Sequence, residues 1–300
     1  MYEILKKNSL VVYFVIIFIG ILTIFSQLHF ENFWFDEMNS FWVSDPTLSL
    51  DETIIRHKKS DYHNTILFNL ILKEFLYLTK YEPSTARFLP FIFGSVTFFF
   101  FGILSYQIKK DNSFILTTFL ASISIYIIKY SQEVRPYTLL LMLSIINIYF
   151  YFLILNELIK NKFYKYLITF IFIIISVLNY STNPFSLIIF FSQIIHMIFI
   201  FFYFNKKNNL LIFCFLPILF FYLLLNYSYL SYQISFSSYM LSADINNVID
   251  GLYFPRFFGS KIMGYTYLIV LLFLIFYQNK KIISNINYSL LVIIFIFTYL

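Results

Sequence analysis

Two neighbouring carboxylates follow the first long apolar run of this sequence. Asp36 and Glu37 end the segment Phe-Trp-Phe-Asp-Glu, which occupies residues 33–37. Large aromatic neighbours lower the local polarity, and a carboxylate in such surroundings is suited to general acid–base catalysis. The alternative interpretation is that the aromatic residues anchor the chain at a membrane surface and the acids mark where it leaves the lipid.

A second polar segment lies between two later apolar runs. It reads Tyr-Ser-Gln-Glu-Val-Arg-Pro-Tyr over residues 130–137. Pro136 is suited to the first position of a helix, which places Arg135 where the helix dipole and unpaired N–H groups favour an anion. This pattern predicts a phosphate site at Arg135. A surface ion pair between Glu133 and Arg135 is the alternative.

Further charged residues are predicted to share this surface. Arg87 stands in Thr-Ala-Arg-Phe-Leu-Pro, before another apolar run, and Lys129 precedes the second polar segment. Together with Arg135, they would surround a lipid-linked phosphate or diphosphate, although Arg87 alone also fits a membrane anchor. Asp61 and His63 add polar groups before a predicted interfacial helix, and a lone histidine is more often structural.

The sequence predicts no metal site and no cofactor. Asp36 or Glu37 would be the oxygen ligands if a divalent cation bound. The single cysteine, Cys214, excludes an internal disulfide, and 6 glycines in the whole chain argue against a nucleotide-binding loop. The four histidines are dispersed without paired ligand spacing: His29, His57, His63 and His196.

Composition assigns the chain to the integral membrane proteins. Hydrophobic residues make up 60% of the 300 residues and charged residues 12%, and the mean hydropathy is +0.78. Soluble domains carry about 25% charged residues, and long apolar runs favour helices over a membrane β-barrel. We therefore expect an all-α polytopic protein with one transmembrane domain over residues 1–300.

Long apolar runs predict where the chain crosses the bilayer. A segment at 65–79 is also apolar, but it contains Lys73 and Glu74 and is shorter than the roughly 20 residues that a span needs. We predict that it lies on the membrane surface as an interfacial helix. The nine predicted spans are 10–28, 88–108, 114–128, 137–155, 166–180, 185–204, 210–227, 263–277 and 288–300.

The distribution of lysines predicts the orientation. Cytoplasmic loops of membrane proteins are enriched in basic residues, and every second segment between the predicted spans carries lysines. The N-terminus is then cytoplasmic, and the long loops 29–87 and 228–262 face outward from the plasma membrane. The net charge of +6 therefore comes from the lysines of the predicted cytoplasmic loops and does not indicate nucleic-acid binding. The predicted cytoplasmic lysines are Lys6, Lys7, Lys109, Lys110, Lys160, Lys162, Lys165, Lys206, Lys207, Lys280 and Lys281.

Neither end of the chain shows a processing signal. The first apolar run has no small-residue cleavage site after it, so we expect a retained helix rather than a signal peptide. The last residue, Leu300, still lies within an apolar run. A natural end and a longer parent protein are both compatible with this.

Taken in order, the polar segments resemble a known enzyme superfamily over roughly residues 10–155. An Asp-Glu pair after the first helix is followed by an Asp/His segment, Ala-Arg-Phe-Leu-Pro and Tyr-Ser-Gln-Glu-x-Arg-x-Tyr. This order resembles the GT-C glycosyltransferases. The nearest type is family 39, which includes dolichyl-phosphate-mannose protein mannosyltransferases and bacterial aminoarabinose transferases. The sequence departs from the family where His-Pro-Pro is frequent, because Asn64 follows His63.

The resemblance implies a GT-C-like helix bundle with interfacial helices in the first outer loop. It also implies a sugar donor linked through phosphate to a polyprenol, used on the outer face. By this resemblance Asp36 activates the acceptor hydroxyl with support from Glu37, Arg135 and Arg87 hold the donor phosphate, and Glu133 and Tyr137 shape the same pocket.

The predicted function is transfer of a sugar to an acceptor hydroxyl on a lipid, protein or glycan. A single displacement would invert the anomeric centre. The loop 228–262, with Asp244, Asp250 and Arg256, is the predicted acceptor contact. The alternatives are a lipid-linked glycan flippase or transporter, a glycan polymerase, and a structural membrane subunit without a site.

Overall fold

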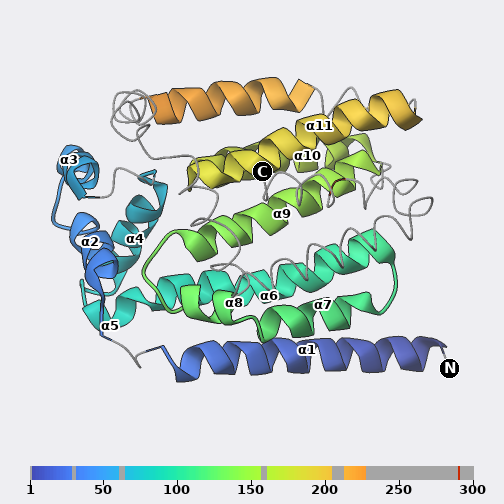
Figure 1. The fold of residues 1–300 in the computed structure, drawn as a ribbon, viewed down its shortest axis with the longest axis horizontal. Helices are drawn as coiled ribbons and strands as arrows, with labels where there is room; N and C mark the ends of the chain where they lie inside the picture. Colours follow the sequence, from blue (N-terminus) through green and yellow to red (C-terminus); the bar gives the residue numbers. More distant parts are fainter. Residues whose placement is uncertain are drawn as a thin grey trace, which may run out of the picture. The chain divides into compact units, whose positions relative to one another are not determined.

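The computed structural model describes residues 2–28, 32–60, 65–156, 161–204 and 213–227, together with Leu290. All regular structure in these residues is helical (Figure 1). The helices are α1 Tyr2–Ser26, α2 Phe35–Val43, α3 Leu50–Ser60, α4 Leu67–Leu78, α5 Pro83–Ala86, α6 Phe88–Lys109, α7 Ser113–Ser122, α8 Ile125–Tyr130, α9 Tyr137–Leu155, α10 Lys162–Tyr180, the 3₁₀ turn η1 Pro184–Ser186, α11 Leu187–Phe204 and a further helix Phe213–Tyr227.

Four of these helices are long and apolar enough to cross a membrane. They are Asn8–Ser26, Pro83–Lys109, Tyr137–Leu155 and Lys162–Tyr180. Large apolar side chains of α1 point away from the protein, with Phe14 54% and Phe18 61% exposed. A soluble monomer rarely exposes a continuous apolar surface, so this arrangement is compatible with the helical membrane protein that the sequence predicts.

Most predicted spans correspond to a helix of similar bounds. The run 137–155 matches α9, and 88–108 matches α6 within one residue. The run 166–180 underestimates α10, which begins at Lys162 because Asn161 caps it by accepting a hydrogen bond from the Phe163 N–H. The runs 263–277 and 288–300 lie outside the described residues, apart from Leu290.

The prediction of one continuous helix over 114–128 is wrong. The structure has α7 and α8 there, and Ser124 between them adopts an extended conformation with φ −68° and ψ 113°. The Ser122 hydroxyl donates to the Phe119 carbonyl at 2.8 Å. A serine hydroxyl that bonds the backbone competes with the helical ladder, and hydropathy does not register this effect.

The chain divides into two compact units. The first comprises residues 1–187 and 208–227, and the second comprises 188–207 and 228–300. Every site residue described below belongs to the first unit. In the second unit the described helix is α11, where the Ser192 hydroxyl donates to the Ile188 carbonyl one turn earlier.

Helix α6 packs against α1, α7 and α9 within the first unit (Figure 1). Two glycines permit the close approach. A Cβ at Gly20 of α1 would lie 2.9 Å from both the Phe98 ring and the Ser122 Cβ, and a Cβ at Gly94 of α6 would lie 2.0 Å from the Ser131 Oγ. Gly94 therefore allows the start of the turn 131–136 to rest directly on α6.

Gly94→Ala is expected to destabilise the protein by about 1–3 kcal/mol, because the added methyl group overpacks this contact. The change should be partly rescued in the double variant Gly94→Ala/Ser131→Gly, which removes the opposing side chain. Chemical unfolding of the detergent-solubilised protein measures both effects, with Ser131→Gly alone as the control. An unaltered unfolding midpoint for Gly94→Ala would show that the turn is not held by this contact.

The first loop forms a small helical layer at one end of the bundle. The predicted interfacial helix at 65–79 appears as α4, whose buried residues include Phe68, Leu72 and Leu76. These side chains join Leu89 and Val134 in one apolar cluster. Helix α4 thus packs its apolar face on the ends of α6 and α9, and the sequence did not predict the companion helices α2 and α3.

Candidate functional site

One end of the first unit brings together segments that are distant in sequence. The Gln132 side-chain amide donates to the Ile24 carbonyl near the end of α1 at 3.1 Å. Arg87, directly before α6, donates to the Leu28 carbonyl at 3.1 Å. The end of α1, the start of α6 and the turn 131–136 therefore meet at this end, which we call the site end.

A buried ion pair forms the centre of the site end. The two guanidinium nitrogens Nε and Nη2 of Arg87 donate to the two carboxylate oxygens of Glu37 at 3.0 and 2.7 Å. Glu37 is fully buried, and Arg87 is 4% exposed. Glu37 also accepts the Val134 N–H at 2.9 Å and the Trp34 N–H at 3.3 Å. One carboxylate thus ties α2 to both α6 and the turn 131–136.

Arg87 makes further contacts to the chain leaving α1. Its Nη2 donates to the Asn32 carbonyl at 3.2 Å, and its guanidinium lies 4.9 Å from the centre of the Phe33 ring. Charge-assisted, bidentate hydrogen bonds of this kind fix geometry as well as charge. The structure therefore places Arg87 and Glu37 against each other, whereas the sequence predicted separate phosphate-binding and catalytic roles for them.

A partly exposed carboxylate, Asp36, faces the buried Arg135 at the site end. The Arg135 Nη2 lies 3.6 Å from the Asp36 Oδ2, and the Asp36 side chain is 38% exposed while that of Arg135 is 8% exposed. The Arg135 guanidinium also lies 5.7 Å from the centre of the Tyr137 ring. The first carboxylate of the acidic pair and the arginine of the turn are thus close enough to contact one small group.

Glu133 is a largely buried carboxylate beside these residues. It is 9% exposed, and its Oε2 has no hydrogen-bond partner in the described part of the chain. Its Oε1 lies 3.7 Å from the Lys129 Nζ, on a side chain that is 64% exposed. Burial raises the pKa of Glu133 above its ordinary value, and the nearby Lys129 only partly opposes the effect.

Glu133→Gln is expected to stabilise the protein at about pH 7, because burial opposes ionisation of the wild-type carboxyl. A raised folded-state pKa means that the folded protein holds the proton more tightly than the unfolded chain. Stability is therefore lost as the pH rises from the ordinary value of 4.5 through the folded-state value. Unfolding curves across this range should show the advantage of Glu133→Gln shrinking as the pH falls.

A pocket of about 570 Å³ opens at the site end. We call it the Glu133 pocket. Asp36 and Arg135 are not among its lining residues, but Asp36 directly precedes Glu37, which lines the pocket, and Arg135 lies two positions after Glu133, which also lines it. The polar and aromatic residues that line the pocket include Trp34, Glu37, Arg87, Lys129, Gln132 and Glu133.

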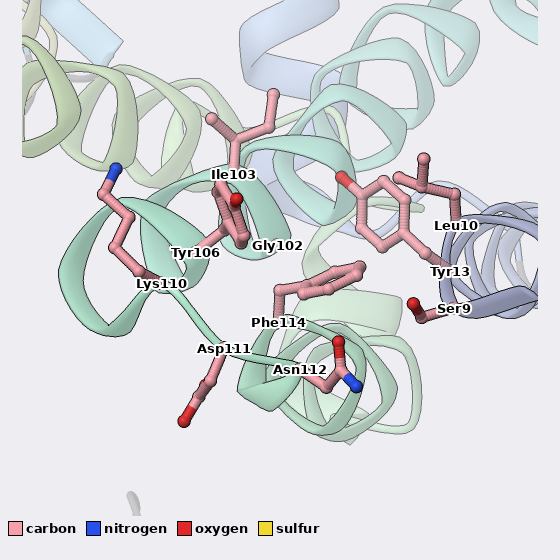
Figure 2. Close-up of a pocket in the computed structure, with 10 residues that line it drawn as sticks. All are labelled: Ser9, Leu10, Tyr13, Gly102, Ile103, Tyr106, Lys110, Asp111, Asn112 and Phe114. Atoms are coloured by element: carbon pink, nitrogen blue, oxygen red, sulfur yellow. The ribbon is translucent and has the colours of Figure 1, made fainter. Parts of the chain in front are cut away.

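A second pocket, of about 520 Å³, lies where α6 ends and α7 begins (Figure 2). Its walls are largely apolar and aromatic, and the rings of Tyr13 and Phe114 lie 5.4 Å apart. Its polar groups bond to the protein, because the Tyr13 hydroxyl donates to the Phe99 carbonyl at 2.6 Å and the Lys110 ammonium to the Gln107 amide at 2.6 Å. None of the predicted site residues lines this pocket.

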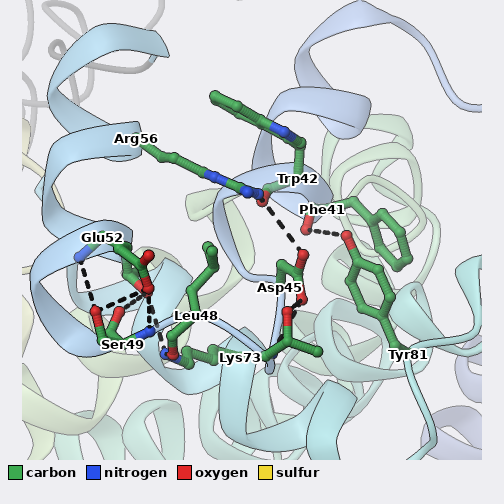
Figure 3. A network of polar contacts seen from close by, with 11 residues as sticks. Phe41, Trp42, Asp45, Leu48, Ser49, Glu52, Arg56, Lys73 and Tyr81 are labelled. Atoms are coloured by element: carbon green, nitrogen blue, oxygen red, sulfur yellow. Dashed lines mark hydrogen bonds and ion pairs between the residues drawn. The ribbon is translucent and has the colours of Figure 1, made fainter.

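A polar network holds α2, α3 and α4 together (Figure 3). The Arg56 guanidinium lies 4.6 Å from the centre of the Trp42 ring and 3.7 Å from the Asp45 carboxylate. Lys73 of α4 donates to the Leu48 carbonyl and to the Thr53 hydroxyl. This network gives α2, and with it the carboxylate of Asp36, a fixed position over the site end.

The chain matches no known protein family, curated protein or solved structure. Its function is therefore argued from the chemistry and geometry of the site end.

Several predicted site residues are not placed by the structure. Asp61 and His63 lie outside the described residues, and so does the predicted acceptor loop 228–262. Among the described residues, no three His, Cys, Asp or Glu side chains gather where a metal ion would bind. The sequence also gave no indication that Trp34 and Gln132 line a pocket, since neither belongs to a recognisable ligand-binding pattern.

Proposed function

We propose that this chain is a membrane glycosyltransferase that moves a sugar from a polyprenyl-phosphate donor to an acceptor hydroxyl. The contact between Asp36 and Arg135 carries the proposal, because a carboxylate suited to act as a general base and a cation suited to bind phosphate lie 3.6 Å apart. Both are required for this reaction, since the incoming hydroxyl loses a proton and the leaving phosphate gains charge.

The proposed reaction is a single displacement. The acceptor oxygen attacks the anomeric carbon, the bond from that carbon to the phosphate oxygen breaks, and the electron pair leaves with the phosphate. The hydroxyl proton passes to the Asp36 carboxylate. A donor phosphate that reaches Arg135 replaces Asp36 as its anionic partner, which makes the carboxylate available to the acceptor.

The other charged residues have supporting roles in this proposal. Lys129, on an exposed side chain, adds positive charge for the phosphate. We assign Arg87 and Glu37 to positioning, because their mutual bonds fix α2 and the turn 131–136. The proposed mechanism uses no cofactor, and Asp36 is the exposed carboxylate through which a divalent cation would bind.

The lysine distribution supports an outward-facing site. Lys109 and Lys110 lie at the end of α6 that is opposite to Arg87, and Lys162 lies at the start of α10. Helix α10 runs antiparallel to α9, as the bonds Asn147–Ser176 and Ser144–Asn179 require. Because basic residues collect at the cytoplasmic ends of spans, the site end belongs to the outer face of the plasma membrane.

A transfer assay in proteoliposomes tests the proposal. Labelled polyprenyl-phosphate sugar is supplied with a lipid or glycan acceptor, and Arg135→Ala is expected to lower transfer about 100-fold by removing a cation from the phosphate. Arg135→Lys, which keeps the charge but loses the planar fork, should retain part of the activity. Lys162→Ala, which removes an exposed cation at the start of α10, is the control. Equal transfer by Arg135→Ala and the control would contradict the assigned site.

The stereochemistry of the product is a separate prediction. A single displacement without a covalent enzyme intermediate inverts the anomeric centre. Anomer-resolved NMR of the purified product against the donor gives the outcome directly, and retention of configuration would exclude the proposed mechanism.

A further inference from the structure

The Glu133 pocket contains a carboxylate, that of Glu133, which has no role in the proposed reaction. Glu133 lines the pocket and is 9% exposed, and its Oε2 has no hydrogen-bond partner among the described residues. A buried carboxylate oxygen without a donor is costly. Its presence on a pocket wall indicates a ligand that supplies hydrogen-bond donors.

Other parts of the pocket wall are aromatic and apolar. Trp34 also lines the pocket and is 48% exposed, so its ring offers a flat surface to a ligand. Ile125 and Ile128 of α8 form the apolar part, and Ile125 is 77% exposed. The apolar wall therefore continues from the pocket to the outer surface of the bundle.

The charges on the wall are nearly balanced. Glu37 and Arg87 neutralise each other through two hydrogen bonds. The Lys129 ammonium, at 3.7 Å from Oε1, is the nearest counter-charge to Glu133 in the structure and belongs to a largely exposed side chain. A negatively charged ligand group at Oε2 would meet like charge in a site of low polarity, which is unfavourable.

We propose that the Glu133 pocket binds the sugar of the lipid-linked donor, and that Glu133 accepts hydrogen bonds from its hydroxyls and selects neutral sugars over uronic acids. This inference rests on the proposed function, because it assumes a sugar donor. A neutral sugar supplies several O–H donors and apolar C–H faces, which fit a carboxylate and an indole ring. The pocket volume of about 570 Å³ is in the range of small-molecule sites.

The apolar wall provides a path for the polyprenyl chain of the donor from the pocket into the bilayer. With the sugar at Glu133 and Trp34, a polyprenyl chain passes Ile125 and Ile128 into the bilayer, without crossing the polar part of the site. In the proposed function the phosphate between sugar and lipid is bound by both Lys129 and Arg135. The donor thus enters sideways from the membrane, between α1 and α8.

The tryptophan content offers a direct binding measurement. The chain has 2 Trp, so Trp42→Phe leaves Trp34 as the single fluorescent reporter on the pocket wall. Three short-chain probes are titrated into this detergent-solubilised variant: polyprenyl-phosphate hexose, the corresponding uronic acid, and polyprenyl phosphate without sugar. The hexose is expected to change Trp34 emission saturably and to bind about ten-fold more tightly than the uronic acid.

The variant Glu133→Gln, made in the Trp42→Phe protein, tests whether the Glu133 carboxylate contributes to binding of the sugar rather than of the polyprenyl phosphate. The dissociation constant of the hexose probe should rise about ten-fold, the difference between hexose and uronic acid should close, and binding of polyprenyl phosphate should be unchanged. The variant should unfold at a higher denaturant concentration than its parent at neutral pH. A purely structural residue would show the opposite change in stability.

The outcomes distinguish this inference from the proposed function. Unchanged hexose binding in Glu133→Gln, or an equal loss for the hexose and polyprenyl phosphate, would overturn the sugar assignment even if transfer is observed. A uronic acid that binds as tightly as the hexose would overturn the selectivity. Conversely, the pocket could bind the hexose more tightly than the uronic acid while no sugar is transferred. The sugar assignment would then stand, and the proposed glycosyltransferase activity would be rejected.

Discussion

Arg87→Ala should lower the free energy of unfolding by about 3–5 kcal/mol, the typical cost of removing one partner from a buried ion pair. The variant leaves Glu37, which is fully buried, without its counter-charge. It also removes the donors to the carbonyls of Leu28 and Asn32. Chemical unfolding of the detergent-solubilised protein, monitored by circular dichroism, measures the loss.

Two variants calibrate this result. Arg56→Ala breaks an exposed pair, with side chains 27% and 19% exposed for Arg56 and Asp45, and its ionic contribution should be about 1 kcal/mol or less. The double variant Glu37→Leu/Arg87→Met removes both charges, so it should cost less than Arg87→Ala alone. If Arg87→Ala were no more destabilising than Arg56→Ala, the pair would not organise the site end.

Asp36→Asn should lower the rate of sugar transfer about 10²–10⁴-fold, the usual contribution of a general base. The amide has nearly the same shape but does not accept the acceptor proton. Because the partly exposed Asp36 is paired with the buried Arg135, the variant should also lose about 1 kcal/mol or less of stability. Initial rates in proteoliposomes, normalised to folded protein, give the effect on kcat.

Asp51→Asn is the matched control for this variant. It makes the same chemical change at an exposed position in the first turn of α3, away from Arg135. Its transfer rate should equal that of the wild type. Full activity in Asp36→Asn would show that another group takes the proton and would remove Asp36 from the mechanism.

The two adjacent acids illustrate where sequence reasoning ends. The sequence predicts a carboxylate pair after the first helix, but it does not say which member faces the solvent. Because successive residues of a helix point about 100° apart, α2 turns Glu37 into the protein and leaves Asp36 partly exposed. Glu37, the predicted supporting acid, is therefore buried in its pair with Arg87 and lines the Glu133 pocket, and Asp36 is the partly exposed member of the two.

Arg87 shows that the sequence also does not predict which residues pair when they are far apart in the chain. Its position before an apolar run predicts a cation at the membrane surface, which Lys129 and Arg135 also satisfy. The structure pairs Arg87 with Glu37, 50 positions away in sequence. This pairing gives Arg87 a positioning role and distinguishes it from Arg135. No local pattern distinguishes the two, since each precedes a helix and follows polar residues.

The sequence by itself determined the helical class, the approximate bounds of α4, α6, α9 and α11 and the order of the polar segments, because the length of an apolar run is a local property that fixes a helix in an apolar environment. Tertiary structure alone decided the bonds of Glu37 and the existence of the Glu133 pocket. These features depend on contacts between residues far apart in the chain, where close packing and the pairing of buried charges select one arrangement.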